Sequence, residues 1–171
     1  MKFYFVIFVF NLCAFVSCVP SEVEPLYSKY EPILIKRNIA DQMIKTTPPK
    51  SITKTGKFYI YKNFIFLAEE NVGYHIYDNT NISSPIDIGF IEVFNSTDIS
   101  ILDNIIYTNQ GTDMLVLDAT NIKDIQLIKR LENVSAEITP DNLGLMPKYL
   151  YKRPQNTITY SWKLIEENKN L

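Results

Sequence analysis

The side chains that could carry out chemistry are few in this sequence. His75 is the only histidine, and the two cysteines, Cys13 and Cys18, both lie within the first eighteen residues. A single histidine excludes a zinc site built from several imidazoles, and one inside an apolar strand is more often a packed side chain than a general base. The chain has no glycine-rich phosphate loop and no acidic calcium-loop spacing. We therefore expect no catalytic residue, no metal and no cofactor.

Cys18 has the clearest chemical assignment. The segment "MKFYFVIFVFNLCAFVSC" places Lys2 before the apolar run Phe3–Val16, which is short for a transmembrane helix and typical of a secretory signal. Its end, "FVSC", resembles the lipobox of bacterial lipoproteins, with Phe15 in place of the usual leucine. This resemblance implies a signal peptide at residues 1–17 and acylation of Cys18, which would anchor the protein permanently in a bilayer. Ordinary cleavage beside an unmodified cysteine is the alternative.

The composition describes one ordinary globular domain. The chain has 171 residues, 46% of them hydrophobic and 21% charged, and 17 Lys and Arg against 19 Asp and Glu give a net charge of -2. Proteins that bind nucleic acid through its phosphates normally carry a basic excess, so we expect no nucleic-acid partner. If the lipobox is cut, no cysteine remains for a disulfide, and the domain must depend on its core.

The middle of the chain, residues 51–134, contains one pattern twice. "YHIYD" at Tyr74–Asp78 and "MLVLD" at Met114–Asp118 are each followed by Thr-Asn-Ile. A period near 40 residues with four short apolar runs per unit is typical of a four-stranded propeller blade, so we predict an all-β fold of two blade-like antiparallel repeats. The predicted strands are 57–61, 64–68, 73–78 and 86–93 in the first repeat and 99–102, 105–109, 114–118 and 126–132 in the second.

The same runs predict burial and turn chemistry. Several are apolar at consecutive positions, which indicates sheets covered on both faces. Aligning the repeats pairs Ile76 with Val116 and Ile88 with Ile128, and we expect Ile76 and Val116 to be buried between sheets. Asp78 and Asp118 end equivalent strands, where a short carboxylate can accept a backbone N–H two residues further on and close the turn.

These strands also carry a family resemblance. "YHIYD" and "MLVLD" resemble the core of the LVIVD-repeat proteins, and "YEPILIKRNIADQMIK" resembles the mature N-terminus of bacterial LVIVD lipoproteins, particularly those of the Bacteroidetes group. The resemblance covers Tyr30–Val134 and implies propeller-like repeats without a common catalytic site. Asp124-Ile125 stands where the family has Asn-Pro, and two repeats are too few for a ring of about four or more blades. A truncated propeller, a two-sheet sandwich and a homo-oligomer that completes the sheet array remain open.

Residues 18–50 are expected to form a tether and a short helical segment. Three prolines and several charges make Val19–Pro32 typical of a linker. "RNIADQMIK" then predicts two helical turns capped by Asn38. The inward side chains of this helix would be Ile39, Met43 and Ile44.

Residues 135–171 are expected to form a covering segment. Apolar and polar side chains alternate in "NTITYSWKL", 156–164, which predicts a strand with one face on the core. The side chains that would cover the repeats are Ile158, Tyr160, Trp162 and Leu164. Tyr149 and Tyr151 precede this strand, and as aromatic residues with a polar end they are candidates for a binding surface as well as for packing at the sheet ends.

These features predict a non-enzymatic, lipid-anchored protein of the bacterial outer membrane, on its periplasmic or cell-surface face. It would contact the membrane through its lipidated N-terminus and offer a binding or scaffold surface to an envelope protein or a glycan. The alternative is a secreted eukaryotic glycoprotein with a small β-sandwich binding domain, because Asn81, Asn95 and Asn133 each begin a glycosylation sequon.

Overall fold

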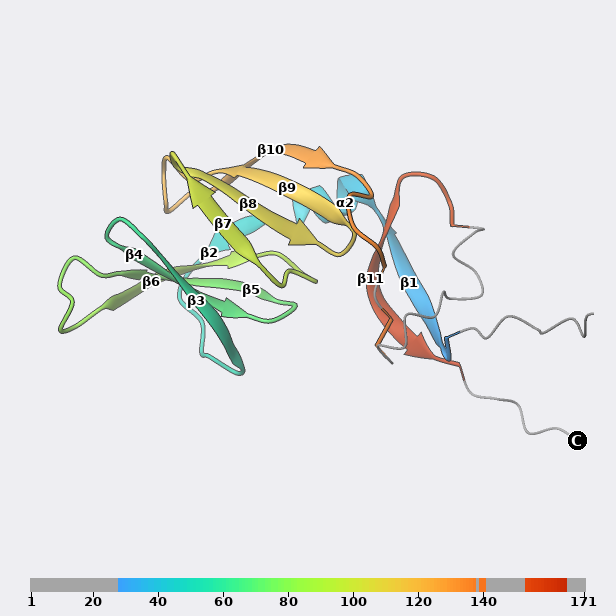
Figure 1. Cartoon of the computed structure of the whole chain (residues 1–171), viewed down its shortest axis with the longest axis horizontal. Helices are drawn as coiled ribbons and strands as arrows, with labels where there is room; N and C mark the ends of the chain where they lie inside the picture. Colours follow the sequence, from blue (N-terminus) through green and yellow to red (C-terminus); the bar gives the residue numbers. More distant parts are fainter. Residues whose placement is uncertain (1–27, 138, 141–152, 166–171) are drawn as a thin grey trace, which may run out of the picture.

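The protein is built almost entirely from antiparallel β-strands, which confirms the predicted all-β class (Figure 1). The computed structural model describes residues 28–137, 139–140 and 153–165. Within this part of the chain two large sheets stack on each other, and a two-stranded ribbon lies at one end of the stack. The short helix α2 (Arg37–Gln42) connects the ribbon to the first large sheet.

The two large sheets correspond to the two predicted repeats. Sheet 1 contains β3 (Thr55–Tyr61), β4 (Phe64–Glu69), β5 (Gly73–Asp78) and β6 (Ile86–Glu92), and β2 (Lys45–Thr47) pairs with the free edge of β6. Sheet 2 contains β7 (Ile99–Leu102), β8 (Ile105–Gln110), β9 (Asp113–Asp118) and β10 (Gln126–Leu131). Both are meanders of consecutive strands, and their strand ends agree with the predicted runs to within two residues.

Both sheets have a shift in strand register at the equivalent position. Between β5 and β6 the register shifts so that Ile88 has no partner, and between β9 and β10 it shifts so that Ile128 has none. Such an extra residue is a β-bulge, which bends a strand locally. Ile88 and Ile128 are paired by the sequence alignment, so the two sheets share backbone shape as well as strand order.

Sheets 1 and 2 pack against each other around one apolar core. The largest fully buried side chains in this core are Phe66, Tyr74, Ile76 and Ile91 from sheet 1 and Ile106, Leu115 and Leu117 from sheet 2. Burying a side chain of this size contributes about 1.5–3 kcal/mol. The contact between the repeats is therefore a main source of stability for a domain that has no disulfide in its described part.

The stack runs head to tail, and this corrects the expectation for Val116. Ile76 is 1% exposed, but Val116 is only half-buried, and the core is filled by its neighbours Leu115 and Leu117. Side chains alternate between the two faces of a strand, so aligned positions point to the same side of each sheet. We call the side with Ile76 and Val116 the front face and the side with His75 and Leu115 the back face. The front face of sheet 1 packs on the back face of sheet 2.

The N-terminal described segment departs from the predicted tether. β1 (Tyr30–Lys36) begins inside it and pairs with β11 (Thr157–Leu164) in the ribbon. The predicted short helix is present as α2, but Lys36 is its N-cap residue and no side chain caps it, so the assignment of Asn38 as cap was wrong. Ile39, expected inward, is 45% exposed. The helix start is fixed by tertiary contacts of its first residue rather than by a local cap.

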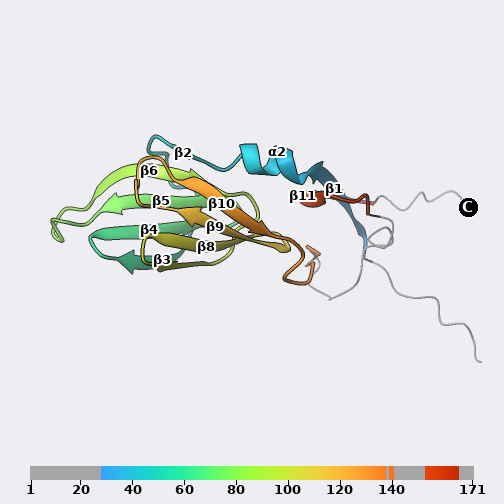
Figure 2. The same cartoon turned by 90° about the horizontal axis from the view of Figure 1, so that it is seen from above.

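The predicted covering strand is present as β11, but it covers the end of the stack (Figure 2). Of the four apolar side chains expected inward only Ile158 is fully buried, while Tyr160 and Leu164 are 41% and 53% exposed. The reason is that β11 pairs with β1 and with no strand of either large sheet. Its link to the repeats includes Asn95 Nδ2, which donates to the carbonyls of Thr159 and Tyr160 over 3.0 and 3.1 Å.

Candidate functional site

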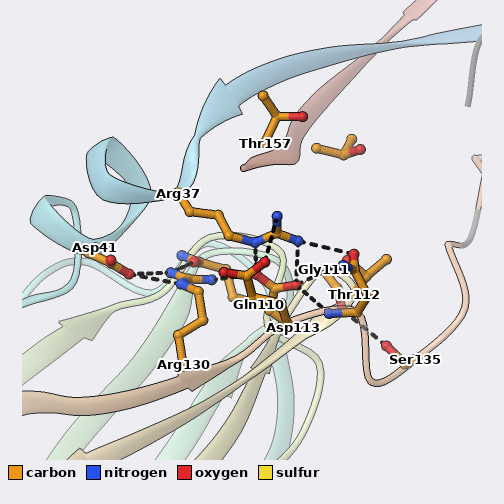
Figure 3. A network of polar contacts seen from close by, with 12 residues as sticks. Arg37, Asp41, Gln110, Gly111, Thr112, Asp113, Arg130, Ser135 and Thr157 are labelled. Atoms are coloured by element: carbon orange, nitrogen blue, oxygen red, sulfur yellow. Dashed lines mark hydrogen bonds and ion pairs between the residues drawn. The ribbon is translucent and has the colours of Figure 1, made fainter. Parts of the chain in front are cut away.

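A cluster of buried charges lies where α2 meets sheet 2 (Figure 3). Asp113, the first residue of β9, is fully buried, and two arginines converge on its carboxylate. Arg37 binds it in bidentate fashion, with Nε 2.7 Å from Oδ2 and Nη2 2.9 Å from Oδ1. Arg130 Nη1 donates to Oδ2 over 3.0 Å, and the backbone N–H of Asn133 donates to Oδ1 over 2.9 Å. The Asp113 cluster consists of Arg37, Asp41, Gln110, Asp113, Arg130, Glu132 and Asn133.

Further acceptors surround the two arginines. Arg130 Nε donates to Asp41 Oδ1 over 2.8 Å, and its Nη2 donates to Gln110 Oε1 over 2.6 Å. Arg37 Nη1 lies 3.2 Å from Glu132 Oε2. Arg37 and Arg130 are 5% and 7% exposed, so these charges are satisfied by protein groups rather than by water.

The charges of the cluster are fixed by one another. Burial by itself would raise the pKa of Asp113, but hydrogen bonds from Arg37, the Asn133 amide and Arg130 outweigh it, so the pKa lies below its ordinary value. The bond to Asp113 in turn raises the pKa of Arg37. Both groups therefore stay charged at neutral pH. A carboxylate enclosed by donors is poorly placed to accept a proton from a substrate, so the cluster is a clamp rather than an acid-base pair.

The Asp113 cluster was missed by the sequence reasoning, because its members are far apart along the chain. Arg37 and Asp113 are separated by 76 positions and come from different elements. One signal was present in the repeat alignment. Arg130 aligns with the buried Phe90, and Asp113 aligns with Gly73. A charged residue at a position that is apolar or glycine in the other repeat indicates a partner from outside the repeats.

Sheet 1 contains a second cluster of polar side chains, which surrounds His75. His75 is fully buried, with Nε2 3.1 Å from Glu69 Oε2 and Nδ1 3.8 Å from Asp87 Oδ2. The hydroxyl and the backbone N–H of Thr53 both donate to Glu69. The bond from the Thr53 hydroxyl, then the bond with His75 and that from the Thr53 N–H, lower the pKa of Glu69 against the effect of burial. The ring of Phe90 packs edge-on against His75. This arrangement agrees with the prediction that His75 is a packed side chain.

Asp78 and Asp118 occupy equivalent turns and make the bonds expected of them. Asp78 Oδ1 accepts the Thr80 N–H over 2.9 Å, and Asp118 Oδ1 accepts the Thr120 N–H over 2.8 Å. Hydrogen bonds from these threonines lower the pKa of both aspartates. Each closes its own turn, so the two do not form a joint site.

The other predicted site residues, Cys18, Tyr149 and Tyr151, lie outside the described residues. All three glycosylation sequons lie within the described residues, and the one at Asn95 is engaged in the fold. Asn95 Nδ2, the nitrogen to which a glycan would be attached, already donates to two carbonyls of β11. Ser96, the next residue, is 2% exposed. Attachment of a glycan at Asn95 would break contacts that hold β11 to the repeats.

Each large sheet has one face that the other sheet leaves uncovered, and on the back face of sheet 1 the β2–β3 connection covers only the part around His75. The back face of sheet 1 exposes Phe58 and Ile60 at 64% and 63%, and the front face of sheet 2 exposes Leu102, Tyr107 and Met114 at 63%, 38% and 38%. Among the helices and strands of the described residues, none lies across either face (Figures 1 and 2). Large apolar side chains grouped on a strand face indicate a site of interaction.

Comparisons of the chain with family models, with curated proteins and with solved structures found no match in any of the three. The resemblance to the LVIVD-repeat proteins therefore stays a prediction that rests on the quoted residues. Within residues 28–137, 139–140 and 153–165, no group of three or more His, Cys, Asp or Glu is placed to hold a metal ion. Helices long and apolar enough to cross a membrane are likewise not found in that part.

Proposed function

We propose that this protein is a non-enzymatic, lipid-anchored component of the bacterial outer membrane whose stacked sheets provide a binding or scaffold surface. The observation that carries the proposal is the pair of open apolar sheet faces on a domain whose buried polar groups serve its own structure. The anchor would be Cys18, whose sequence context supports acylation. An envelope protein or a glycan is the class of partner proposed for the surface, with Tyr149 and Tyr151 as further candidates to contact it.

Two features support a clamp-and-scaffold role over catalysis. The buried charges of Arg37, Asp113 and Arg130 bond one another and join α2 to β9 and β10. His75 is enclosed under the connection between β2 and β3, where Thr53 covers its partner Glu69. A substrate could reach His75 only if this connection moved. The engagement of Asn95 also favours the lipoprotein over the secreted glycoprotein, because it disfavours one of the three sequons.

The anchor is tested by labelling with a tagged fatty acid during expression of the full chain in a bacterial host. Mass spectrometry of the mature protein should show an acylated N-terminal Cys18, and the protein should fractionate with membranes. Cys18→Ala should lose the label and accumulate as an uncleaved or soluble form, because no other nucleophile at that position can accept the lipid. Cys13→Ala is the matched control and should be labelled normally. An unmodified N-terminus in the parent protein would refute the anchor.

A further inference from the structure

We infer that the protein associates with itself head to tail, the front face of sheet 2 in one copy packing on the back face of sheet 1 in the next. This inference deepens the scaffold half of the proposed function by naming the partner as a second copy of this chain. It does not depend on the lipid anchor. It follows from comparing the two open faces, position by position, with the interface already formed between the two sheets inside one chain.

Away from the covered region around His75, the back face of sheet 1 has the same arrangement of side chains as the buried back face of sheet 2. The strand pairings align β3 with β7 and β4 with β8, with the side chains of each pair on the same side. Phe58 and Ile60, exposed in sheet 1, align with Ile99 and Ile101, which contact the core in sheet 2. Further along, Ile65, Leu67 and Tyr77 align with Ile106, Thr108 and Leu117, all buried in sheet 2. Apolar back-face side chains that sheet 2 buries against sheet 1 thus have exposed or half-buried apolar counterparts on the back face of sheet 1.

The open front face of sheet 2 is likewise the counterpart of a buried one. Leu102, Ile105, Tyr107, Met114 and Val116 align with Tyr61, Phe64, Phe66, Tyr74 and Ile76, which pack on sheet 2 within the chain. All five remain apolar or aromatic. This face can therefore make toward another copy the type of contact that the front face of sheet 1 makes internally.

Such a contact is heterologous, because it joins two different surfaces and leaves one of each free at the ends of the pair. Repeating it gives a closed ring when the rotation between copies allows closure and an open filament when it does not. Blades of this kind close in rings of roughly 4–8, which corresponds to roughly two to four copies of a two-sheet chain. The chain would thereby complete the sheet array that two repeats leave unfinished.

The contact between copies should be weaker than the one within the chain. Inside the chain, the Tyr74 hydroxyl donates to the Asp98 carbonyl over 2.8 Å, and the Asn104 N–H donates to the Tyr61 hydroxyl over 2.9 Å. The residues aligned with these tyrosines are Met114 and Leu102, which have no hydroxyl. Apolar burial alone would hold the copies together, so we expect an assembly that dissociates on dilution.

Two substitutions, one on each open face, test this arrangement with the full chain in detergent micelles. Phe58→Asp places a charge on the back face of sheet 1, and Leu102→Asp places one on the front face of sheet 2. Both side chains are more than half exposed, so each variant should fold, which thermal unfolding checks. Leu164→Asp is the control, since Leu164 is 53% exposed in β11 of the two-stranded ribbon and belongs to neither large sheet. Light scattering should show that the parent and Leu164→Asp associate, while either face variant alone is a monomer.

The decisive measurement is a mixture of equal amounts of the two face variants. Each copy keeps one intact face, and these two faces are complementary only in a head-to-tail contact. The mixture should therefore recover a dimer and nothing larger. A back-to-back pair would instead be broken by Phe58→Asp and untouched by Leu102→Asp, and a front-to-front pair would show the reverse.

A cysteine version gives an independent readout, because β3 and β7 are neighbours across the internal interface. Ile60→Cys and Leu102→Cys copies, mixed under oxidising conditions, should form a disulfide between the two variants but not within either one. A parent protein that is monomeric at every concentration would overturn the inference. So would the pattern of variant effects expected of a back-to-back pair or of a front-to-front pair. None of these outcomes alters the mass of the mature N-terminus, so failure here and failure of the lipid anchor are distinguishable.

Discussion

Removing the carboxylate of Asp113 is the sharpest test of the clamp between α2 and sheet 2. Asp113 is fully buried and accepts hydrogen bonds from Arg37, Arg130 and the Asn133 amide. Asp113→Ala would leave these donors facing a methyl group. Because both guanidinium groups are almost inaccessible to solvent, water cannot readily replace the lost acceptor.

The expected size of the loss follows from what the arginines retain. Removing one partner of a buried ion pair costs about 3–5 kcal/mol. Arg37 keeps its contact with Glu132, and Arg130 keeps those with Asp41 and Gln110, so neither is left without an acceptor. The loss should therefore lie at the lower end of the range, about 3 kcal/mol.

Urea unfolding of the full chain measures this loss as a shift of the midpoint at unchanged slope. Asp124→Ala is the matched control, because Asp124 is an exposed carboxylate near β10 whose side chain bonds only Gln126 among the contacts of the described residues. It should change the free energy of unfolding very little. A loss below about 1 kcal/mol for Asp113→Ala, which is typical of an exposed pair, would refute the clamp.

The same variant should show a defined pH dependence. The pKa of Asp113 is depressed in the folded protein because the donors around it outweigh the effect of burial. Its contribution is therefore fully present above the unfolded pKa of about 3.9 and is lost as the pH falls through the lower, folded pKa. The difference in stability between the parent and Asp113→Ala should be constant near neutrality and shrink below about pH 4. A difference that stayed constant into strong acid would show that the carboxylate is not the source.

Three further predictions concern the repeats. Ile76→Asp should lower the free energy of unfolding by more than about 3 kcal/mol because it buries an unpaired charge, whereas Val116→Asp, at the aligned but outward position, should lower it much less. Equal losses in urea unfolding would contradict the head-to-tail stack. Tyr74→Phe should cost about 1 kcal/mol by removing a buried hydroxyl that bonds across the sheets, and an unchanged melting temperature would argue against that bond. Asp78→Ala and Asp118→Ala should give small losses equal to each other, and a marked inequality in thermal unfolding would show that the two turns are not equivalent.

The features that the sequence predicted well are those encoded within a few neighbouring residues. Alternation and run length located all eight strands of the two repeats, because each strand carries its own apolar pattern. Asp78 and Asp118 were assigned as turn residues because their bonds reach only two positions along the chain. The alignment also paired Ile88 with Ile128, the two bulge positions.

The features that the sequence did not predict depend on distant partners. The start of α2 is held by the contact of Arg37 with Asp113, which no local cap rule could reveal. The sequence around β1 resembles a linker, because the partner strand β11 that makes it a strand lies more than a hundred residues further along the chain. The alternation in β11 indicated a buried face, but a ribbon of two strands has little sheet to cover, so most of its apolar side chains stay exposed.

The mistaken expectation for Val116 has a physical meaning of its own. Apolar residues at consecutive strand positions indicate a sheet that is covered on both sides. In the described chain the other sheet covers one side of each large sheet, and on the second side of sheet 1 the β2–β3 connection covers only the part around His75. Strands β3, β4, β8 and β9 therefore carry more apolar side chains than the contact between the two sheets buries. The remaining apolar side chains lie on the two uncovered faces, whose positions align with those of the contact formed inside the chain. Each repeat has a front face and a back face that can pack on another repeat. A stack of two repeats therefore leaves one front face and one back face unpaired. In the proposed head-to-tail assembly, further copies of the chain would supply both missing halves.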